Sequence, residues 1–197
     1  MTAPLVSVIG PPASGKTTLA RLLAEELPAR LILEDYQGNP FLSGFFLGQS
    51  ELALPAQLYF LFSRLGQLAQ ATWPGEGACV SDYGFCQDAV YAARSLKGQD
   101  LAVYNRLSAQ ARRLVTCPKL VIHLDGPEEL LLERIARRGR EYEAAFTAEF
   151  LGWMRSRYRQ VTDELSCPVL SVDVSQMDLR QDPQRQRLLG QVREILA

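Results

Sequence analysis

The fold is decided by the stretch Gly10-Pro11-Pro12-Ala13-Ser14-Gly15-Lys16-Thr17-Thr18, which lies between an apolar run (5–9) and a helical pattern (17–27). A strand, a G-x-x-x-x-G-K-T loop and a helix in this order are the context of a phosphate-binding P-loop. An ordinary glycine turn is the alternative, but the complete pattern in this context rarely arises by chance. The stretch therefore predicts binding of a nucleoside triphosphate.

Each residue type in this loop has a physical reason. Glycine lets the backbone curl so that its N–H groups point at phosphate oxygens, and the start of the helix adds a positive dipole end. Lys16 is expected to reach the β- and γ-phosphates, and the Thr17 hydroxyl to bind Mg²⁺. The residues expected to hold the nucleoside triphosphate are Gly10, Ala13, Ser14, Gly15, Lys16, Thr17 and Thr18.

The composition of the 197 residues fits one domain, 1–197, with a substantial core. The formal net charge is −1, so no global field attracts a nucleic acid polymer or an anionic membrane. No apolar run approaches the roughly 20 residues that span a bilayer, and a strand begins too early to leave room for a signal peptide. The four cysteines show neither C-x-x-C spacing nor nearby histidines, which is typical of thiols in a reducing compartment. We therefore expect a cytoplasmic protein.

Five short apolar runs are predicted to be strands: 5–9, 30–33, 78–81, 119–124 and 168–172. They are continuous rather than alternating, which is typical of strands buried on both faces of a parallel sheet. Long helical patterns separate them, so the predicted class is α/β with right-handed crossovers. The single histidine, His123, lies inside the fourth run and is interpreted as a core residue.

Acidic residues follow four of these runs: Glu34, Asp82, Asp125 and Asp173. Ligands of an open parallel sheet bind beyond the carboxyl ends of its strands, so all four are candidates for the site. Asp125 precedes Gly-Pro-Glu-Glu at the start of a helical pattern and is interpreted as a helix N-cap rather than a metal ligand. Asp173 is assigned no role. Glu34 and Asp82 have no such cap role, and we expect them beside the P-loop.

The helical pattern at 54–71 carries two stripes. Its core stripe consists of Leu54, Leu58, Leu61, Leu65 and Leu68. Gln57, Phe60 and Arg64 recur at i, i+3 and i+7 and form a second stripe beside the first. Two interpretations of the second stripe are open: it faces solvent, or it faces a flat aromatic ligand, which the large Phe60 favours.

Arginine is concentrated at the end of the helical pattern 130–139, at Arg134, Arg137, Arg138 and Arg140. Arg137 has Glu133 four residues earlier, the favourable orientation for an ion pair in a helix. Arg134 and Arg138 share a face that has no acid in that position, so like charges repel there. An anionic ligand would compensate this charge, and phosphoryl transfer requires positive charge around the moving group. With Gly139 as a hinge, the cluster predicts a mobile lid over the triphosphate.

Together these segments resemble the deoxynucleoside kinase family over nearly the whole chain. Three motifs carry the resemblance around the P-loop: Glu34 with Asn39-Pro40-Phe41-Leu42 and Phe45, Gln57-x-Tyr59-x-Leu61-x-Ser63-Arg64, and Arg134-Ile135-x-x-Arg138-Gly139-Arg140-x-x-Glu143. The resemblance implies a P-loop kinase fold, in which helices flank a five-stranded parallel sheet of order 2-3-1-4-5. It also implies a homodimer.

The resemblance implies a role for each matching residue. Glu34 is expected to be the general base that accepts the proton of a nucleoside 5′-hydroxyl. The base of the nucleoside is expected to contact Gln57, Arg64 and Asp88, with Phe60 of the same helix beside them. The remaining expected contacts are Arg134, Arg138 and Arg140 with the phosphates, Glu143 with the sugar 3′-hydroxyl, and Asp82 with the metal.

One position departs from the family pattern. Many members carry an acid, an arginine and a serine after the third strand, where this chain has Asp82-Tyr83-Gly84. In the family, that arginine helps to hold the 5′-oxygen and the catalytic acid, and the sequence identifies no cation that replaces it. The form Asp82-Tyr83-x-Phe85-x-x-Asp88 resembles a bacterial subgroup, so we interpret the departure as variation within an active family.

The predicted reaction is transfer of the γ-phosphoryl group of ATP, with Mg²⁺, to the 5′-hydroxyl of a deoxynucleoside. Arg64 and Asp88 favour a purine or cytosine over thymine, because thymine has no exocyclic amino group and would leave a buried charge unpaired. The alternatives are a nucleoside monophosphate kinase such as a thymidylate kinase, and an ATP-binding switch or regulatory subunit that transfers no phosphate. A nucleoside monophosphate kinase needs a cation beside the third strand, where Tyr83 offers none. A switch or regulatory subunit needs neither Glu34 nor the lid arginines.

Overall fold

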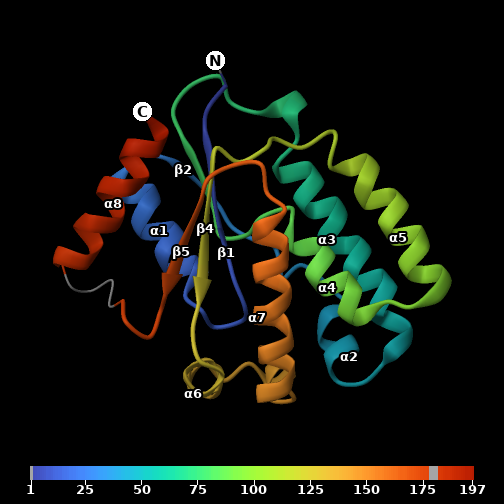
Figure 1. The fold of residues 1–197 in the computed structure, drawn as a ribbon. Coiled ribbons are helices and arrows are strands. Elements are labelled where there is room, and N and C mark those ends of the chain that lie inside the picture. Colours follow the sequence, from blue (N-terminus) through green and yellow to red (C-terminus); the bar gives the residue numbers. More distant parts are fainter. Residues whose placement is uncertain (1, 178–181) are drawn as a thin grey trace.

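In the computed structural model, which describes residues 2–177 and 182–197, five strands form one sheet (Figure 1). The strands are β1 (Leu5–Ile9), β2 (Arg30–Ile32), β3 (Cys79–Ser81), β4 (Leu120–Asp125) and β5 (Val169–Asp173). Every pairing is parallel, and the order is β2-β3-β1-β4-β5. The predicted α/β class and strand order are therefore confirmed, with strand limits that differ from the predicted ones by a single residue at β2 to β5.

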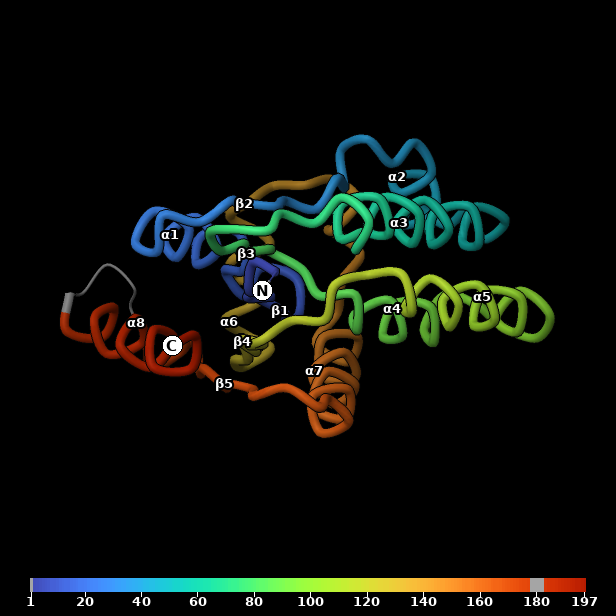
Figure 2. Tube along the Cα trace, turned by 90° about the horizontal axis from the view of Figure 1, so that it is seen from above, coloured from blue at the N-terminus to red at the C-terminus, as the bar shows by residue number. Residues whose placement is uncertain are grey.

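Helices cover both faces of the sheet. They are α1 (Lys16–Glu26), α2 (Leu42–Phe46), α3 (Ala53–Gln67), α4 (Gln87–Ser95), α5 (Gly98–Ala111), α6 (Glu128–Arg138), α7 (Ala148–Asp163) and α8 (Asp182–Leu196). Short 3₁₀ turns occupy Ser50–Leu52, Gln70–Thr72 and Glu141–Glu143. Helices α1 and α8 lie on one face, whereas α3, α4, α5 and α7 lie on the other (Figure 2). In the described part of the chain, none of the helices combines the length and the apolar character needed to cross a membrane.

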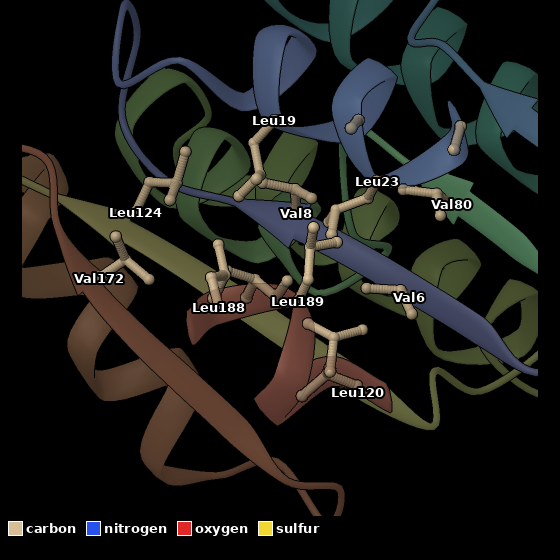
Figure 3. Packing of buried hydrophobic residues seen from close by; sticks show 14 of the residues in the cluster. Val6, Val8, Leu19, Leu23, Val80, Leu120, Leu124, Val172, Leu188 and Leu189 are labelled. Carbon is tan, nitrogen blue, oxygen red and sulfur yellow. The ribbon is translucent and has the colours of Figure 1, made fainter. Parts of the chain in front are cut away.

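The core lies between the sheet and the helices of each face. On the side of α1 and α8, strand residues pack against helix leucines; Figure 3 shows Val6, Val8, Val80 and Leu120 with Leu19, Leu23, Leu188 and Leu189. A second cluster fills the other face and includes Leu5, Ile32 and Leu61. Neighbouring strand residues are thus buried on opposite faces, which explains the continuous apolar runs. His123 is buried in β4 and stacks on Tyr158 of α7, so its interpretation as a core residue is confirmed.

Helix α3 ends earlier than its leucine pattern predicted. The pattern extends from 54 to 71, but α3 ends at Gln67. The Gln70 N–H donates to the Leu114 carbonyl oxygen at 2.9 Å, and Ala69 pairs with Val115 in an antiparallel bridge. These bonds to the segment after α5 use backbone groups that would otherwise continue the helix. The core stripe packs as predicted, with every one of its leucines in the same cluster.

The interpretation of Asp125 as a helix cap is wrong. Helix α6 begins at Glu128 with Pro127 in the N-cap position, and Asp125 is the last residue of β4. The Asp125 carboxylate instead accepts hydrogen bonds from Arg155 Nε at 2.6 Å and Arg159 Nη2 at 2.7 Å. Burial disfavours the ion, but these hydrogen bonds hold the pKa of Asp125 below its usual range. Asp125 therefore fixes α7 against the sheet.

Candidate active site

A cleft of about 1210 Å³ lies beyond the carboxyl ends of the strands. Its lining combines the loop after β1, residues that follow β2 and β3, one face of α3 and the arginines of α6. Figure 1 shows α6 and α2 at this end of the sheet. The cleft therefore lies where ligands bind in open parallel sheets.

The loop between β1 and α1 has the backbone that its glycines predict. Gly10 has φ +146°, and a side chain there would collide with the Leu124 carbonyl oxygen. Gly15 has φ +99° and directly precedes α1, which begins at Lys16, one residue earlier than predicted. Ala13 has φ 58°, in the left-handed region that residues other than glycine rarely adopt. The loop is thus a tightly curled segment at a helix N-terminus, as an anion site requires.

Lys16 folds back over this loop. Its ammonium donates to the carbonyl oxygens of Gly10 and Pro11, each at 3.0 Å. The residue as a whole is half-buried, but the loop and the cleft enclose the ammonium, and this loss of hydration lowers the pKa of Lys16 to about 8. The Ser14 hydroxyl is buried and has no hydrogen-bond partner within the described residues. A phosphate group would give Ser14 an acceptor and Lys16 a counter-ion, so these residues fit a nucleotide.

Two oxygen ligands for a metal meet at the start of α1. The Thr17 hydroxyl donates to Asp82 Oδ2 at 2.6 Å, and Asp82 Oδ1 accepts the backbone N–H of Glu34 at 2.8 Å. Burial raises the pKa of Asp82, and a cation beside it would favour the ionised form. A hydroxyl and a carboxylate suit Mg²⁺, which takes one or two protein ligands and keeps waters and phosphate oxygens as the others. Thr17 and Asp82 therefore fit this ion.

The Glu34 carboxylate is held by one of its two oxygens. Oε1 accepts from Arg64 Nε and Gln87 Nε2, each at 3.0 Å, and also from Arg64 Nη2. No hydrogen bond from a described residue engages Oε2, and Glu34 lines the cleft. One carboxylate oxygen is therefore available to accept the proton of a ligand hydroxyl.

The second stripe of α3 faces inward, so its interpretation as a solvent-facing stripe is wrong. Gln57, Phe60 and Arg64 are 2%, 8% and 3% exposed, and all three line the cleft. Gln57 Nε2 is 3.4 Å from Ser95 Oγ, whereas its buried Oε1 has no partner in the described chain and can accept from a ligand. Asp88 is buried and pairs with Arg64, but it lies outside the lining of the cleft. Asp88 thus contacts Arg64, a residue of the cleft lining, without lining the cleft itself.

The expected lid arginines all line the cleft: Arg134, Arg137, Arg138 and Arg140. The pairing of Arg137 with Glu133 that their spacing favours is absent from the ion pairs between described residues, so that interpretation is wrong. Arg134 Nη2 donates to the Val174 carbonyl oxygen at 3.2 Å. Gly139 has φ 67° and ends α6, which places the chain reversal at the expected hinge.

Glu143 holds two of these arginines. Arg138 Nε donates to Glu143 Oε2 at 3.0 Å, and Arg140 Nη1 donates to Oε1 at 3.3 Å. The Arg140 guanidinium also lies 3.9 Å from the centre of the Tyr36 ring. In the structure, the residue expected to accept the 3′-hydroxyl, Glu143, therefore contacts two arginines that are expected to bind phosphate, and all three line the cleft.

Comparisons with known proteins show the family of the chain. A family model described as deoxynucleoside kinase matches residues 6–197. The chain belongs to the deoxynucleoside kinase family. Among curated relatives of this family, a deoxyguanosine kinase of Bacillus subtilis is 26% identical over 99% of each chain. A deoxyadenosine kinase of Dictyostelium discoideum is 29% identical over 87% of this chain and 72% of its own. The fold is similar to that of a deoxyadenosine kinase from M. mycoides with bound dATP, with a TM-score of 0.81 and 19% identity over 96% of this chain and 99% of the other.

Sequence reasoning missed several residues in the cleft of this deoxynucleoside kinase family member. Gln67 and Tyr91 line it, and Gln87 donates to Glu34. Gln67 lies three residues after Arg64, and Tyr91 three after Asp88, so extending each helical face by one turn would have found both. Tyr36 also lines the cleft, and no spacing in the sequence marks it.

Proposed function

We propose that the chain is an ATP-dependent deoxynucleoside 5′-kinase. The observation that carries the proposal is the position of Glu34, whose free carboxylate oxygen lies in the same cleft as the P-loop. Asp82 connects the two, because it binds the Thr17 hydroxyl with one oxygen and the Glu34 backbone with the other. A base for the acceptor hydroxyl and a site for the triphosphate are thus held in a fixed relation, as phosphoryl transfer requires.

In the proposed reaction, the proton of the 5′-hydroxyl passes to Glu34 as the 5′-oxygen bonds to the γ-phosphorus. The bond from that phosphorus to the β–γ bridging oxygen breaks, and ADP leaves. Lys16 stabilises the charge that develops on the moving group, and Arg134, Arg138 and Arg140 add positive charge from the lid. Mg²⁺, when held by Thr17 and Asp82, neutralises part of the charge on the phosphates. We propose that Glu143 accepts the 3′-hydroxyl.

The nucleoside is proposed to be a purine deoxynucleoside or deoxycytidine. The partnerless Gln57 Oε1 is an acceptor for an exocyclic amino group, which purines and cytosine carry and thymine lacks. The curated relatives include kinases named for deoxyguanosine and deoxyadenosine, which favours a purine. A monophosphate acceptor is disfavoured, because Tyr83 offers its phosphate no cation and the guanidinium that packs on Tyr83, that of Arg64, is already paired with Glu34 and Asp88.

The test is the kcat/KM of the wild type with ATP and each of the four deoxynucleosides or their monophosphates. We expect nucleoside-dependent turnover, with the best purine or cytosine substrate at least about tenfold better than thymidine, because an unpaired buried polar group costs about 1–3 kcal/mol. Thymidine as the best substrate would overturn the assignment of the base pocket. A preference for monophosphates would favour a thymidylate kinase-like activity, and ATP binding without transfer would favour a switch.

We also propose that two copies of the chain form a homodimer through α3 and α5. These helices contact each other at one end of the molecule (Figure 2), and each exposes a large apolar side chain. Phe62 of α3 is 57% exposed and Leu107 of α5 is 41% exposed. If a two-fold axis packs a second copy on the same helices, Phe62 and Leu107 of each copy become buried in the interface.

Sedimentation velocity tests the dimer. The wild type should sediment with twice the mass of the chain, and Phe62→Asp should shift it to the monomer by placing a charge in the interface. Leu47→Asp is the matched control, because Leu47 is equally exposed (60%) but lies outside α3 and α5. A monomeric wild type, or the same shift in both variants, would contradict this interface.

We further infer a cytoplasmic location. The four cysteines carry free thiols, which supports a reducing compartment. Fractionation of cells that produce the tagged chain would check it.

A further inference from the structure

The Arg64 guanidinium is enclosed between two rings and two carboxylates. Its Cζ lies 5.1 Å from the ring centre of Phe60 and 5.6 Å from that of Tyr83. Nε and Nη2 donate to Glu34 Oε1, and Nη1 pairs with Asp88 Oδ1. Burial by itself would lower the pKa of Arg64, but the attraction of Glu34 raises it above its ordinary value. The group is therefore a fixed cation that bridges two acids.

Tyr83 supports this cation from the loop that follows β3. Its hydroxyl donates to Gln67 Oε1 at 2.6 Å, and Gln67 Nε2 donates to the Leu33 carbonyl oxygen at 3.0 Å. This chain of hydrogen bonds connects the ring that packs on Arg64 with the residue that directly precedes Glu34. Tyr83 thus supplies a wall behind the guanidinium, while the charge itself comes from α3.

We propose that Arg64 positions the Glu34 carboxylate for proton transfer, and so supplies the cation that the residue after Asp82 does not. Arg64 is a positioning residue in this role, distinct from any contact that it makes with the base. The proposal rests on the proposed kinase function, because Glu34 needs alignment as a base only if the chain phosphorylates a hydroxyl.

The geometry allows Arg64 to serve both acids and a ligand at once. Arginine has five N–H donors; the hydrogen bonds to Glu34 use two of them, and the ion pair with Asp88 occupies one side of Nη1. One donor remains on each terminal nitrogen, so a nucleoside base can bind without displacing Glu34. The contacts to Glu34 all engage Oε1, which leaves Oε2 for the substrate hydroxyl.

This role and a role in base binding alone have different kinetic consequences. If Arg64 only contacted the base, its loss would raise KM and leave kcat unchanged at saturating nucleoside. If it positions Glu34, kcat falls as well. This fall in kcat disappears when Glu34 can no longer act as a base, because Arg64 then has no catalytic group to position.

The experiment is a double-mutant cycle with a radiolabelled phosphate assay over nucleoside concentrations that reach saturation, so that kcat and KM are both measured. We expect Arg64→Gln to lower kcat about 10- to 100-fold, as misplacement of a catalytic group does. In a Glu34→Gln background, the same change should lower kcat by less than about threefold. Gln57→Ala is the matched control: it loses a base contact without touching Glu34, so it should raise KM by the same factor in both backgrounds.

Circular dichroism and thermal melting establish whether Arg64→Gln folds. If it does not, the cycle is run with Arg64→Lys, which keeps the charge but has one nitrogen for two carboxylates. Its kcat should fall about tenfold, again only while Glu34 is present. An active wild type in which Arg64 variants change only KM, or lose kcat equally in both backgrounds, would overturn this inference alone. A wild type without nucleoside-dependent turnover would overturn the proposed function, and this inference with it.

Discussion

Replacing Lys16 by alanine is expected to lower kcat about 100- to 1000-fold while the protein stays folded. In the proposed reaction the ammonium stabilises charge on the transferring phosphoryl group, and one such contact is worth about 3–4 kcal/mol. Among the described residues, its hydrogen bonds go to the carbonyl oxygens of Gly10 and Pro11, so its removal breaks no ion pair between them. Steady-state kinetics with saturating ATP and nucleoside provide the measurement.

Lys119→Ala is the matched control for this prediction. It removes the same charge from an exposed lysine that precedes β4, at the end of the sheet opposite the cleft. This variant should keep wild-type activity. If Lys16→Ala were within a few-fold of the wild type, the P-loop lysine would have no part in the mechanism.

The lowered pKa of Lys16 provides a second readout for the same variant. With a pKa of about 8, Lys16 is partly deprotonated in the unliganded protein at pH 8, and a bound triphosphate favours the charged form. ATP binding at pH 8 should therefore take up protons, and ATP affinity should fall as the pH rises above 8. Below about pH 7 the lysine is already charged, so the uptake should vanish. Calorimetric titrations in buffers of different ionisation enthalpy measure this uptake, and Lys16→Ala should lose it.

The parts of the fold that could be predicted are those set by local pattern. The P-loop was predictable because Gly10 and Gly15 occupy backbone positions with positive φ, and an apolar strand precedes them. The strands were predictable because residues buried on both faces give continuous apolar runs. The end of α3 was not, because it depends on hydrogen bonds to Leu114 and Val115, more than forty residues along the chain.

In the candidate site too, local sequence pattern predicted some features, and contacts between distant elements determined the others. The residue types and their spacing predicted that Glu34, Gln57 and Arg64 belong to one site. Glu34 follows the end of a strand, and Gln57 and Arg64 lie on one face of a helix. Spacing within one element does not say which side chains meet across elements. The contact between Arg64 and Glu34 was therefore not predicted, and neither were the contacts of the lid arginines with Glu143. Asp125 was taken for a cap for the same reason: its arginine partners lie on α7, thirty or more residues later.

Replacing Glu34 by glutamine is expected to lower kcat about 10²- to 10⁴-fold, because it removes the proposed base and keeps the shape of the side chain. The donors around Oε1 determine how the amide sits. Arg64 and Gln87 require an acceptor there, so the amide oxygen takes the Oε1 position and the NH₂ group takes that of Oε2. The NH₂ group can donate to the 5′-oxygen but cannot accept its proton. Nucleoside affinity should therefore change much less than kcat.

Equilibrium binding and single-turnover rates separate the two effects. Titration of nucleoside should give dissociation constants for the wild type and Glu34→Gln that lie within about tenfold, while the rate per bound complex falls by the full factor. Glu141→Gln is the matched control, since it makes the same change of charge at an exposed position outside the cleft lining. If nucleoside binding disappeared in Glu34→Gln while the rate per bound complex stayed normal, Glu34 would be a binding residue. The proton of the 5′-hydroxyl would then have to pass to another group, and the arrangement of donors around Oε1 would serve to orient the sugar rather than a base.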